Sequence, residues 1–179
     1  DLAGAFLQDN LKDMKLLGIT SVSKYAKATS YIKEITGQVK RLMEKGCAYD
    51  LEDGIYFDIS KSKAYGKLSG RTALQAEDAV SRIDYSKNKK NRGDFCLWKR
   101  EYNEEEPGWS SMFGRGRPGW HIEDTAITEK FLGLQYDIHG GGRDLMFPHH
   151  EAEIAQMEAL SGKVPMAKYW MHTGFLTIE

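Results

Sequence analysis

His149 and Glu153, four residues apart, are the strongest candidates for chemistry in this sequence. Residues at this spacing stack on one face of a helix, and Pro148 directly before them is typical of a first helical turn. An imidazole nitrogen and a carboxylate oxygen placed in this way can share one cation, and zinc accepts both donors. The spacing therefore predicts a metal site, with a surface ion pair as the alternative. His150 and Glu151 project to other faces of the helix, so one metal does not easily use all four side chains.

A second candidate segment, Gly119-Trp-His-Ile-Glu-Asp-Thr125, leads into another predicted helix. Trp120 and His121 follow a glycine, and a large aromatic side chain in such a loop often walls a pocket. Asp124 or Thr125 can cap the helix that follows, and a carboxylate is favourable there without any metal. The histidines direct attention to this part of the chain, because all five fall in its last third: His121, His139, His149, His150 and His172.

Three successive glycines in Asp137-Ile-His-Gly-Gly-Gly-Arg-Asp144 mark a third candidate segment, with a predicted turn at residues 140–142. Glycines after a strand let the backbone approach a ligand closely. These three glycines do not form the GxGxxG fingerprint, and GxxxxGK[ST] does not occur in the sequence, so this segment is neither a Rossmann dinucleotide fingerprint nor a P-loop. Asp144 either holds a substrate ammonium group or pairs with Arg143 or a helix end.

The elements that must position these side chains are predicted from apolar periodicity and turn residues. Thr29 or Ser30 is the expected cap of one helix and Gly46 its end. The order strand, helix, strand near the end predicts a βαβ unit, and hence an α/β fold with a parallel sheet flanked by helices. We expect helices over residues 2–17, 30–46, 122–132 and 148–160, a hairpin over 49–59, long loops over 60–115, and strands over 136–139 and 169–178.

The composition limits the class of protein. With 179 residues, 41% hydrophobic and 28% charged, the chain can bury a core of its own. The net charge of −1 gives no overall attraction to nucleic acid, although the basic run over residues 87–92 can meet RNA phosphates or simply form a solvated loop. The acidic run over residues 104–106 is likewise typical of a solvated loop. Two cysteines without a CxxC pair favour a reducing compartment, the cytoplasm. No stretch approaches about 18 apolar residues, so no membrane partner is expected.

Five motifs, in order and at matching separations, resemble the catalytic domain of the cysteinyl-tRNA synthetases. They are Gly116-Arg-Pro-Gly-Trp-His-Ile-Glu123, Asp137-Ile-His-Gly-Gly-Gly142, Asp144-Leu-Met-Phe-Pro-His-His-Glu151, Glu153-Ile-Ala-Gln156 and Trp170-Met-His-Thr-Gly-Phe175. Weaker upstream patterns, such as Tyr65-Gly-Lys-Leu-Ser69, extend the resemblance over nearly the whole chain. It implies part of a class I Rossmann-like catalytic domain, with a first half over residues 1–46, a connective-peptide-type insertion over 47–115, and a second half over 116–179.

The resemblance also implies roles for the candidate residues. In this family a zinc ion binds the thiolate of the substrate cysteine, and two of its ligands correspond to His149 and Glu153. Asp124 stands where the family has a cysteine ligand, so it either coordinates zinc with His149 and Glu153, which we expect, or leaves the metal and caps the helix. A further cysteine ligand would lie upstream of residue 1. The resemblance implies that the remaining candidates contact the substrate: Trp120 as the wall of the cysteine pocket, His139 and Asp144 near the amine and carboxylate, and His121 and His150 along the cleft.

The implied activity is that of a cysteine-tRNA ligase, which joins cysteine to tRNA-Cys through a cysteinyl adenylate, using ATP with magnesium. Such an enzyme needs a His-Ile-Gly-His motif and a Lys-Met-Ser-Lys-Ser loop, and these residues contain neither. We therefore expect the chain to be an internal, monomeric piece that is inactive alone. Two alternatives are a ligase that joins cysteine to an amino sugar, as in mycothiol synthesis, and a non-catalytic module that binds metal or RNA.

Overall fold

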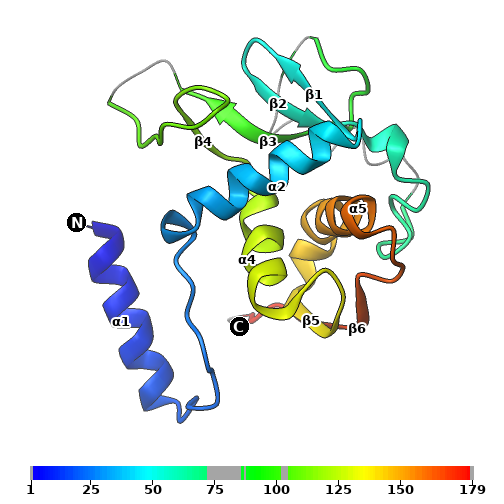
Figure 1. Ribbon diagram of the computed structural model, residues 1–179. Helices are drawn as coiled ribbons and strands as arrows, with labels where there is room; N and C mark the ends of the chain where they lie inside the picture. Colours follow the sequence, from blue (N-terminus) through cyan, green and yellow to red (C-terminus); the bar gives the residue numbers. More distant parts are fainter. Residues whose placement is uncertain (1, 72–85, 87, 102–104, 178–179) are drawn as a thin grey trace.

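The computed structural model describes residues 2–71, 86, 88–101 and 105–177 as an α/β structure with two sheets. The helices are α1 (Leu2–Leu16), α2 (Ile32–Glu44), α4 (Ile122–Leu132) and α5 (His149–Ser161), with short 3-10 turns η1 (Ala28–Ser30), η2 (Ile59–Lys61) and η3 (Arg143–Met146). The strands are β1 (Ala48–Leu51), β2 (Gly54–Phe57), β3 (Phe95–Arg100), β4 (Gly116–Pro118), β5 (Tyr136–Gly142) and β6 (Ala167–Thr173). Strands β1 to β4 form an antiparallel sheet, and β5 pairs with β6 in parallel. In Figure 1, α2, α4 and α5 lie between the two sheets.

Helix α2 shows how a local pattern becomes part of the core. Ile35, Val39 and Leu42, at helical spacing, form its apolar face and are completely buried. Gly46 ends the helix in the left-handed conformation, at φ +68°, as predicted. The predicted cap is wrong, because residues 28–30 form η1, and Tyr31 occupies the N-cap position without a side-chain hydrogen bond.

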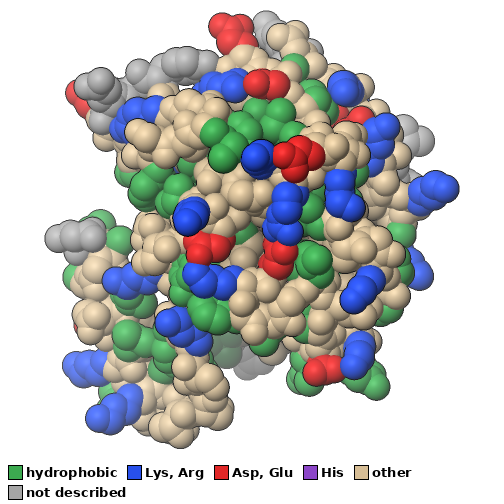
Figure 2. All heavy atoms as spheres, viewed as in Figure 1, with side chains coloured by type: hydrophobic (Ala, Val, Ile, Leu, Met, Phe, Trp, Pro, Cys, Tyr) green, Lys and Arg blue, Asp and Glu red, His purple; other side chains and the backbone are tan. Residues whose placement is uncertain are grey.

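Helix α1 confirms the first predicted helix but makes little contact with the rest of the chain. None of its residues is buried, and Figure 1 shows it standing apart from the other elements. The space-filling view in Figure 2 shows the same separation. None of the helices within the described ranges is long and apolar enough to cross a membrane.

The antiparallel sheet confirms one prediction and corrects another. The hairpin is present, with Ala48 opposite Phe57 in β1 and β2. Residues 60–115 are not loops throughout, since β3 is an inner strand of the sheet and Phe95 stacks on Phe57 with ring centroids 5.0 Å apart. The prediction failed because glycine and lysine around a short apolar run obscured it. Lys87 of the basic run and Glu104 of the acidic run lie outside the described residues.

One hydrophobic core spans all three predicted segments. It contains Ile35 from α2, Phe57 from β2 and Ile122 from α4, all completely buried. Strand β4 pairs with β3 across the boundary predicted at residue 115. A smaller cluster of Tyr136, Met157, Met166 and Ala167 lies within the third segment alone. The division into two half-domains and an insertion stays a prediction, but the three segments share the larger core.

Strands β5 and β6 confirm the predicted parallel pair. The turn predicted at residues 140–142 is wrong, because these glycines continue β5 and pair with residues 171–173 of β6. Their lack of side chains serves close packing here, because a Cβ on Gly141 would lie 2.8 Å from the Cε1 atom of His150. The chain turns one step later, in η3. Strand β6 ends at residue 173, before residue 178, which lies outside the described part of the chain.

Candidate functional site

The first turns of α5 carry the centre of the candidate site. Nine of the 13 residues of this helix are buried, and His149, His150 and Glu153 are among them. Buried polar side chains need internal partners, which are hydrogen bonds or cations. No histidine is visible on the face seen in Figure 2, which agrees with this burial.

Asp124, His149 and Glu153 converge on one point between α4 and α5. The Nε2 atom of His149 lies 2.9 Å from Asp124 Oδ2 and 2.8 Å from Glu153 Oε1. Asp124 is the third residue of α4 and does not cap it, because His121 occupies the N-cap position. Thr125 does not cap the helix either, since its hydroxyl donates to the buried Gln38 Oε1 at 2.6 Å. The capping prediction for both residues is therefore wrong.

This group has the donors that a divalent metal requires. One imidazole nitrogen and two carboxylate oxygens lie within 4.8 Å of one another. The second oxygen of Glu153, Oε2, is buried and accepts no hydrogen bond among the described residues. His139 Nε2 lies 3.1 Å from it but does not form a hydrogen bond with it. Buried carboxylate oxygens rarely lack a partner, and a cation supplies one. The residues therefore fit a zinc ion, which accepts nitrogen and oxygen ligands.

The charges at this centre depend on one another. Burial opposes the charged form of His149, but hydrogen bonds to Asp124 and Glu153 outweigh it and raise its pKa to about 9. Burial raises the pKa of Glu153, and His149 only partly offsets this effect. The two carboxylates thus share one positive charge on His149 when no metal is present. A divalent cation would take over this charge.

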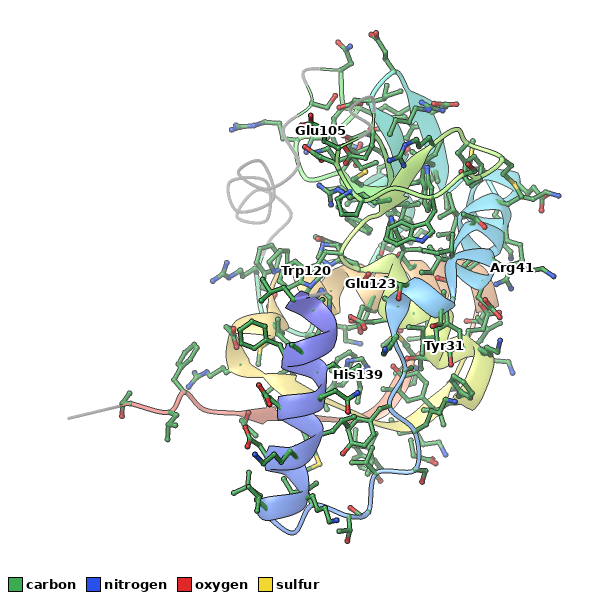
Figure 3. The ribbon with its side chains drawn as sticks, turned by 90° about the vertical axis from the view of Figure 1, so that its left-hand side faces the viewer. Tyr31, Arg41, Glu105, Trp120, Glu123 and His139 are labelled. Atoms are coloured by element: carbon green, nitrogen blue, oxygen red, sulfur yellow. The ribbon has the colours of Figure 1, made fainter. Side chains whose placement is uncertain are left out.

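Aromatic rings enclose the donor group on the side of α4. The ring centroid of Trp120 lies 4.5 Å from that of His149, and Nδ1 of His121 lies 2.8 Å from Nδ1 of His149. Trp120 keeps 48% of its surface exposed, so it forms a wall between the group and solvent. Figure 3 views Trp120 and His139 from the side on which α1 stands.

The parallel strands enclose the group on the other side. His139 in β5 is paired with Trp170 in β6, and their ring centroids are 4.6 Å apart. Nδ1 of His150 lies 2.8 Å from Nε2 of His172. Burial is the main cause that lowers the pKa of the enclosed imidazoles, to about 3 for His121 and His150 and about 4 for His139. These rings are therefore neutral near pH 7.

Three residues of this enclosure were not predicted. Trp170 and His172 share one face of β6, because alternate residues of a strand point to the same side, and this spacing was the available signal. The hydroxyl oxygen of Tyr136 lies 2.5 Å from His139 Nδ1, and burial raises the pKa of Tyr136. A phenol three residues before a histidine in a strand gives no comparable signal.

Asp144 is the one predicted site residue that the structure does not bring to this cluster. It lies exposed in η3. In the described part of the chain it makes no ion pair with Arg143 and no hydrogen bond to a side chain of the cluster. Its role in substrate binding stays a prediction.

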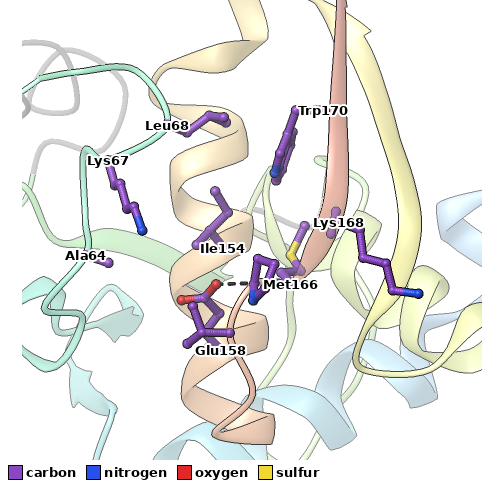
Figure 4. Close-up of a pocket in the computed structure, with 11 residues that line it drawn as sticks. Ala64, Lys67, Leu68, Ile154, Glu158, Met166, Lys168 and Trp170 are labelled. Atoms are coloured by element: carbon purple, nitrogen blue, oxygen red, sulfur yellow. Dashed lines mark hydrogen bonds between the residues drawn. The ribbon is translucent and has the colours of Figure 1, made fainter.

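A pocket of about 330 Å³ adjoins the cluster through Trp170 (Figure 4). Its wall is mostly apolar and includes Leu68, Ile154 and Met166. The carboxylate of Glu158 accepts a hydrogen bond of 3.1 Å from the Met166 amide at its edge. The pocket thus continues the enclosed region toward the loop after η2.

Comparison with known sequences gives one consistent result. The family model described as "tRNA synthetases class I (C) catalytic domain" matches residues 1–179. Relatives named cysteine–tRNA ligase from Thermoplasma acidophilum and Thermoplasma volcanium are each 52% identical over 179 residues, which is all of this chain and 39% of each relative. One from Methanococcus maripaludis is 51% identical over 181 residues, covering 100% of this chain and 37% of the relative. The chain thus spans about two fifths of the length of the curated relatives it matches.

Proposed function

We propose, from the premise that this chain belongs to the family of class I (C) tRNA synthetase catalytic domains, that the whole protein joins cysteine to tRNA-Cys with ATP. Magnesium would accompany the ATP, and a cysteinyl adenylate would be the activated form. The relatives that carry the cysteine–tRNA ligase name cover all of this chain at about half identity, which supports the proposal. Both cysteines are free thiols, in keeping with a cytoplasmic location.

The convergence of Asp124, His149 and Glu153 beside Trp120 is the observation that carries the proposal. These three side chains would hold a zinc ion. When bound, zinc supplies a preference for sulfur over oxygen ligands, which separates cysteine from serine. Trp120 would exclude water from the side chain of the substrate.

The neutral imidazoles suit a pocket for an amino acid. His121, His139 and His150 can donate or accept hydrogen bonds near pH 7 without a positive charge that would repel the substrate ammonium group. His139 and the exposed Asp144 would contact the amine and carboxylate region of the substrate, and His121 and His150 would line the cleft. This assignment rests on the family resemblance and on the positions of the three imidazoles.

Pyrophosphate exchange in the intact protein tests the proposal. We expect exchange that depends on both ATP and cysteine, with serine giving far less, followed by transfer of cysteine to tRNA. This chain alone should give no exchange, because it contains neither nucleotide motif. Exchange without any transfer to tRNA would instead favour an amino-sugar ligase. Equal exchange with serine would refute the role of the metal in selecting the substrate.

A further inference from the structure

A group of exposed cations lies on the antiparallel sheet, away from the histidine cluster. We call Lys45, Lys61, Lys90 and Arg92 the basic surface; all four are exposed. They come from the end of α2, from η2 and from the segment before β3. The sequence suggested that the last of these segments is either a solvated loop or a contact for RNA phosphates.

Backbone and side-chain hydrogen bonds bring the three segments together at Asp58. The Asp58 amide donates to the carbonyl of Cys47 at 2.9 Å, which joins η2 to the end of α2. The side-chain amide of Asn91 donates to Asp58 Oδ1 at 3.0 Å, which joins the segment before β3 to the same point. Lys45 and Lys61 both act electrostatically on the thiol of Cys47, although burial dominates and raises its pKa. The three segments that carry the cations are therefore neighbours in space.

The segment of residues 88–94 is anchored by Asp94, and is not a free loop. Asp94 is completely buried, and its carboxylate accepts hydrogen bonds of 2.9 Å from the amides of Ile59 and Asn91 and of 2.6 Å from the Tyr49 hydroxyl. The ammonium group of Lys90 lies 4.3 Å from the centre of the Tyr49 ring. Lys90 and Arg92 are thus presented from an anchored backbone, so little backbone conformational entropy is lost when they bind a ligand.

Most charges of this region are separated by depth. Glu44, the last residue of α2, is exposed and pairs with Lys40 at 3.6 Å. Asp58 and Asp94 are buried and accept hydrogen bonds from the amides of Ser60 and Ile59. Its lysines and Arg92 face solvent. The net charge of the chain is only −1, so this local excess is not part of a general positive field. A surface with this arrangement attracts a polyanion.

We propose that the basic surface binds the phosphodiester backbone of the RNA substrate. This inference rests on the proposed function, because that function requires an RNA partner. Each lysine that neutralises a phosphate releases a counterion, so the logarithm of affinity falls with the logarithm of salt by about 0.7 to 0.9 per contact. Three lysines in contact with phosphates therefore account for a slope of roughly 2 to 3.

The test replaces Lys45, Lys61 and Lys90 together by glutamine in the intact protein and measures binding of its tRNA at several salt concentrations. We expect weaker binding at low salt and a slope smaller by roughly 2 to 3. Cysteine-dependent pyrophosphate exchange should be unchanged, because none of these residues belongs to the histidine cluster. An unchanged salt slope would overturn the proposal.

A matched control carries the same loss of charge at other exposed positions, Lys12, Lys33 and Lys163, each replaced by glutamine. We expect its salt slope to stay close to that of the parent protein. An equal fall in slope for both triple variants would overturn the proposal, since it would show a response to net charge alone. Absence of pyrophosphate exchange in the parent protein would count against the proposed function, whereas the salt slopes test the surface itself.

Discussion

Replacement of Asp124 by alanine tests the metal site directly, because Asp124 supplies one of three donor atoms that converge on a single point. A zinc site with four protein ligands binds with about 10–16 kcal/mol, so one donor accounts for roughly 2.5–4 kcal/mol. We therefore expect zinc affinity of the intact protein to fall by roughly 100- to 1,000-fold in Asp124→Ala. His149 and Glu153 would remain in contact, since their 2.8 Å interaction does not involve Asp124.

The assay is a zinc titration against a competing chelator, with metal content measured on the purified protein. Glu123→Gln is the matched control, because this neighbouring carboxylate is not one of the converging donors Asp124, His149 and Glu153. It should leave the zinc affinity unchanged. Asp124→Cys should restore tight binding, and with cobalt in place of zinc it should add a thiolate-to-metal charge-transfer absorption. Parental zinc affinity in Asp124→Ala would show that Asp124 is not a ligand and would refute the reasoning from convergence.

Three further predictions concern the support of the site. Burial raises the pKa of Glu129, but the ion pair with Arg41 outweighs this effect, so the pKa is lowered overall. The ion pair therefore stabilises the folded state fully above the pKa of the unfolded chain, about 4.3, and this stabilisation is lost as the pH falls through the lower pKa of Glu129 in the folded protein. Glu129→Gln should thus cost about 1 kcal/mol in urea unfolding at pH 7 and less at pH values below that range; an equal cost throughout would contradict this. Glu151→Ala removes the acceptor of the Ser69 amide, 2.7 Å away, and hydrogen exchange of that amide should rise roughly tenfold or more, whereas parental exchange would argue against the bond. Gly141→Ala should reduce the free energy of unfolding by about 1–3 kcal/mol and so lower the melting temperature, because the added Cβ crowds the ring of His150. An unchanged melting temperature would show that this ring moves aside freely.

Local patterns in the sequence were sufficient for the helices and for the ligand pair on α5. The apolar spacing around Ile35 and the glycine at residue 46 are interactions within a few residues, so they predict α2 without knowledge of the fold. The spacing of His149 and Glu153 likewise fixes their shared face, and the structure places their donor atoms 2.8 Å apart. These features depend on backbone geometry alone.

Features that depend on distant partners were missed or misassigned. For Asp124 the sequence left a helix cap and a zinc ligand as alternatives, because its partner is an imidazole 25 residues later in the chain. The glycines of β5 have the composition of a turn, and neither their pairing with β6 nor the close approach of the His150 ring to Gly141 can be inferred from neighbouring residues. Strand β3 is similar, because its inner position in the sheet depends on pairing with β2 across a long stretch of sequence. Sequence patterns do not contain this information.

The burial of α5 on several sides limits how the helix can be oriented. Rotation by one residue, about 100°, would remove Glu151 from the amides of Gly66 and Ser69 and would separate Glu153 from His139 of β5 at the same time. Each stranded carboxylate would cost several kcal/mol in the protein interior. Misoriented packings of α5 are therefore strongly disfavoured. The donor atoms reach their positions as the chain folds, and an arriving metal ion has little structure left to rearrange.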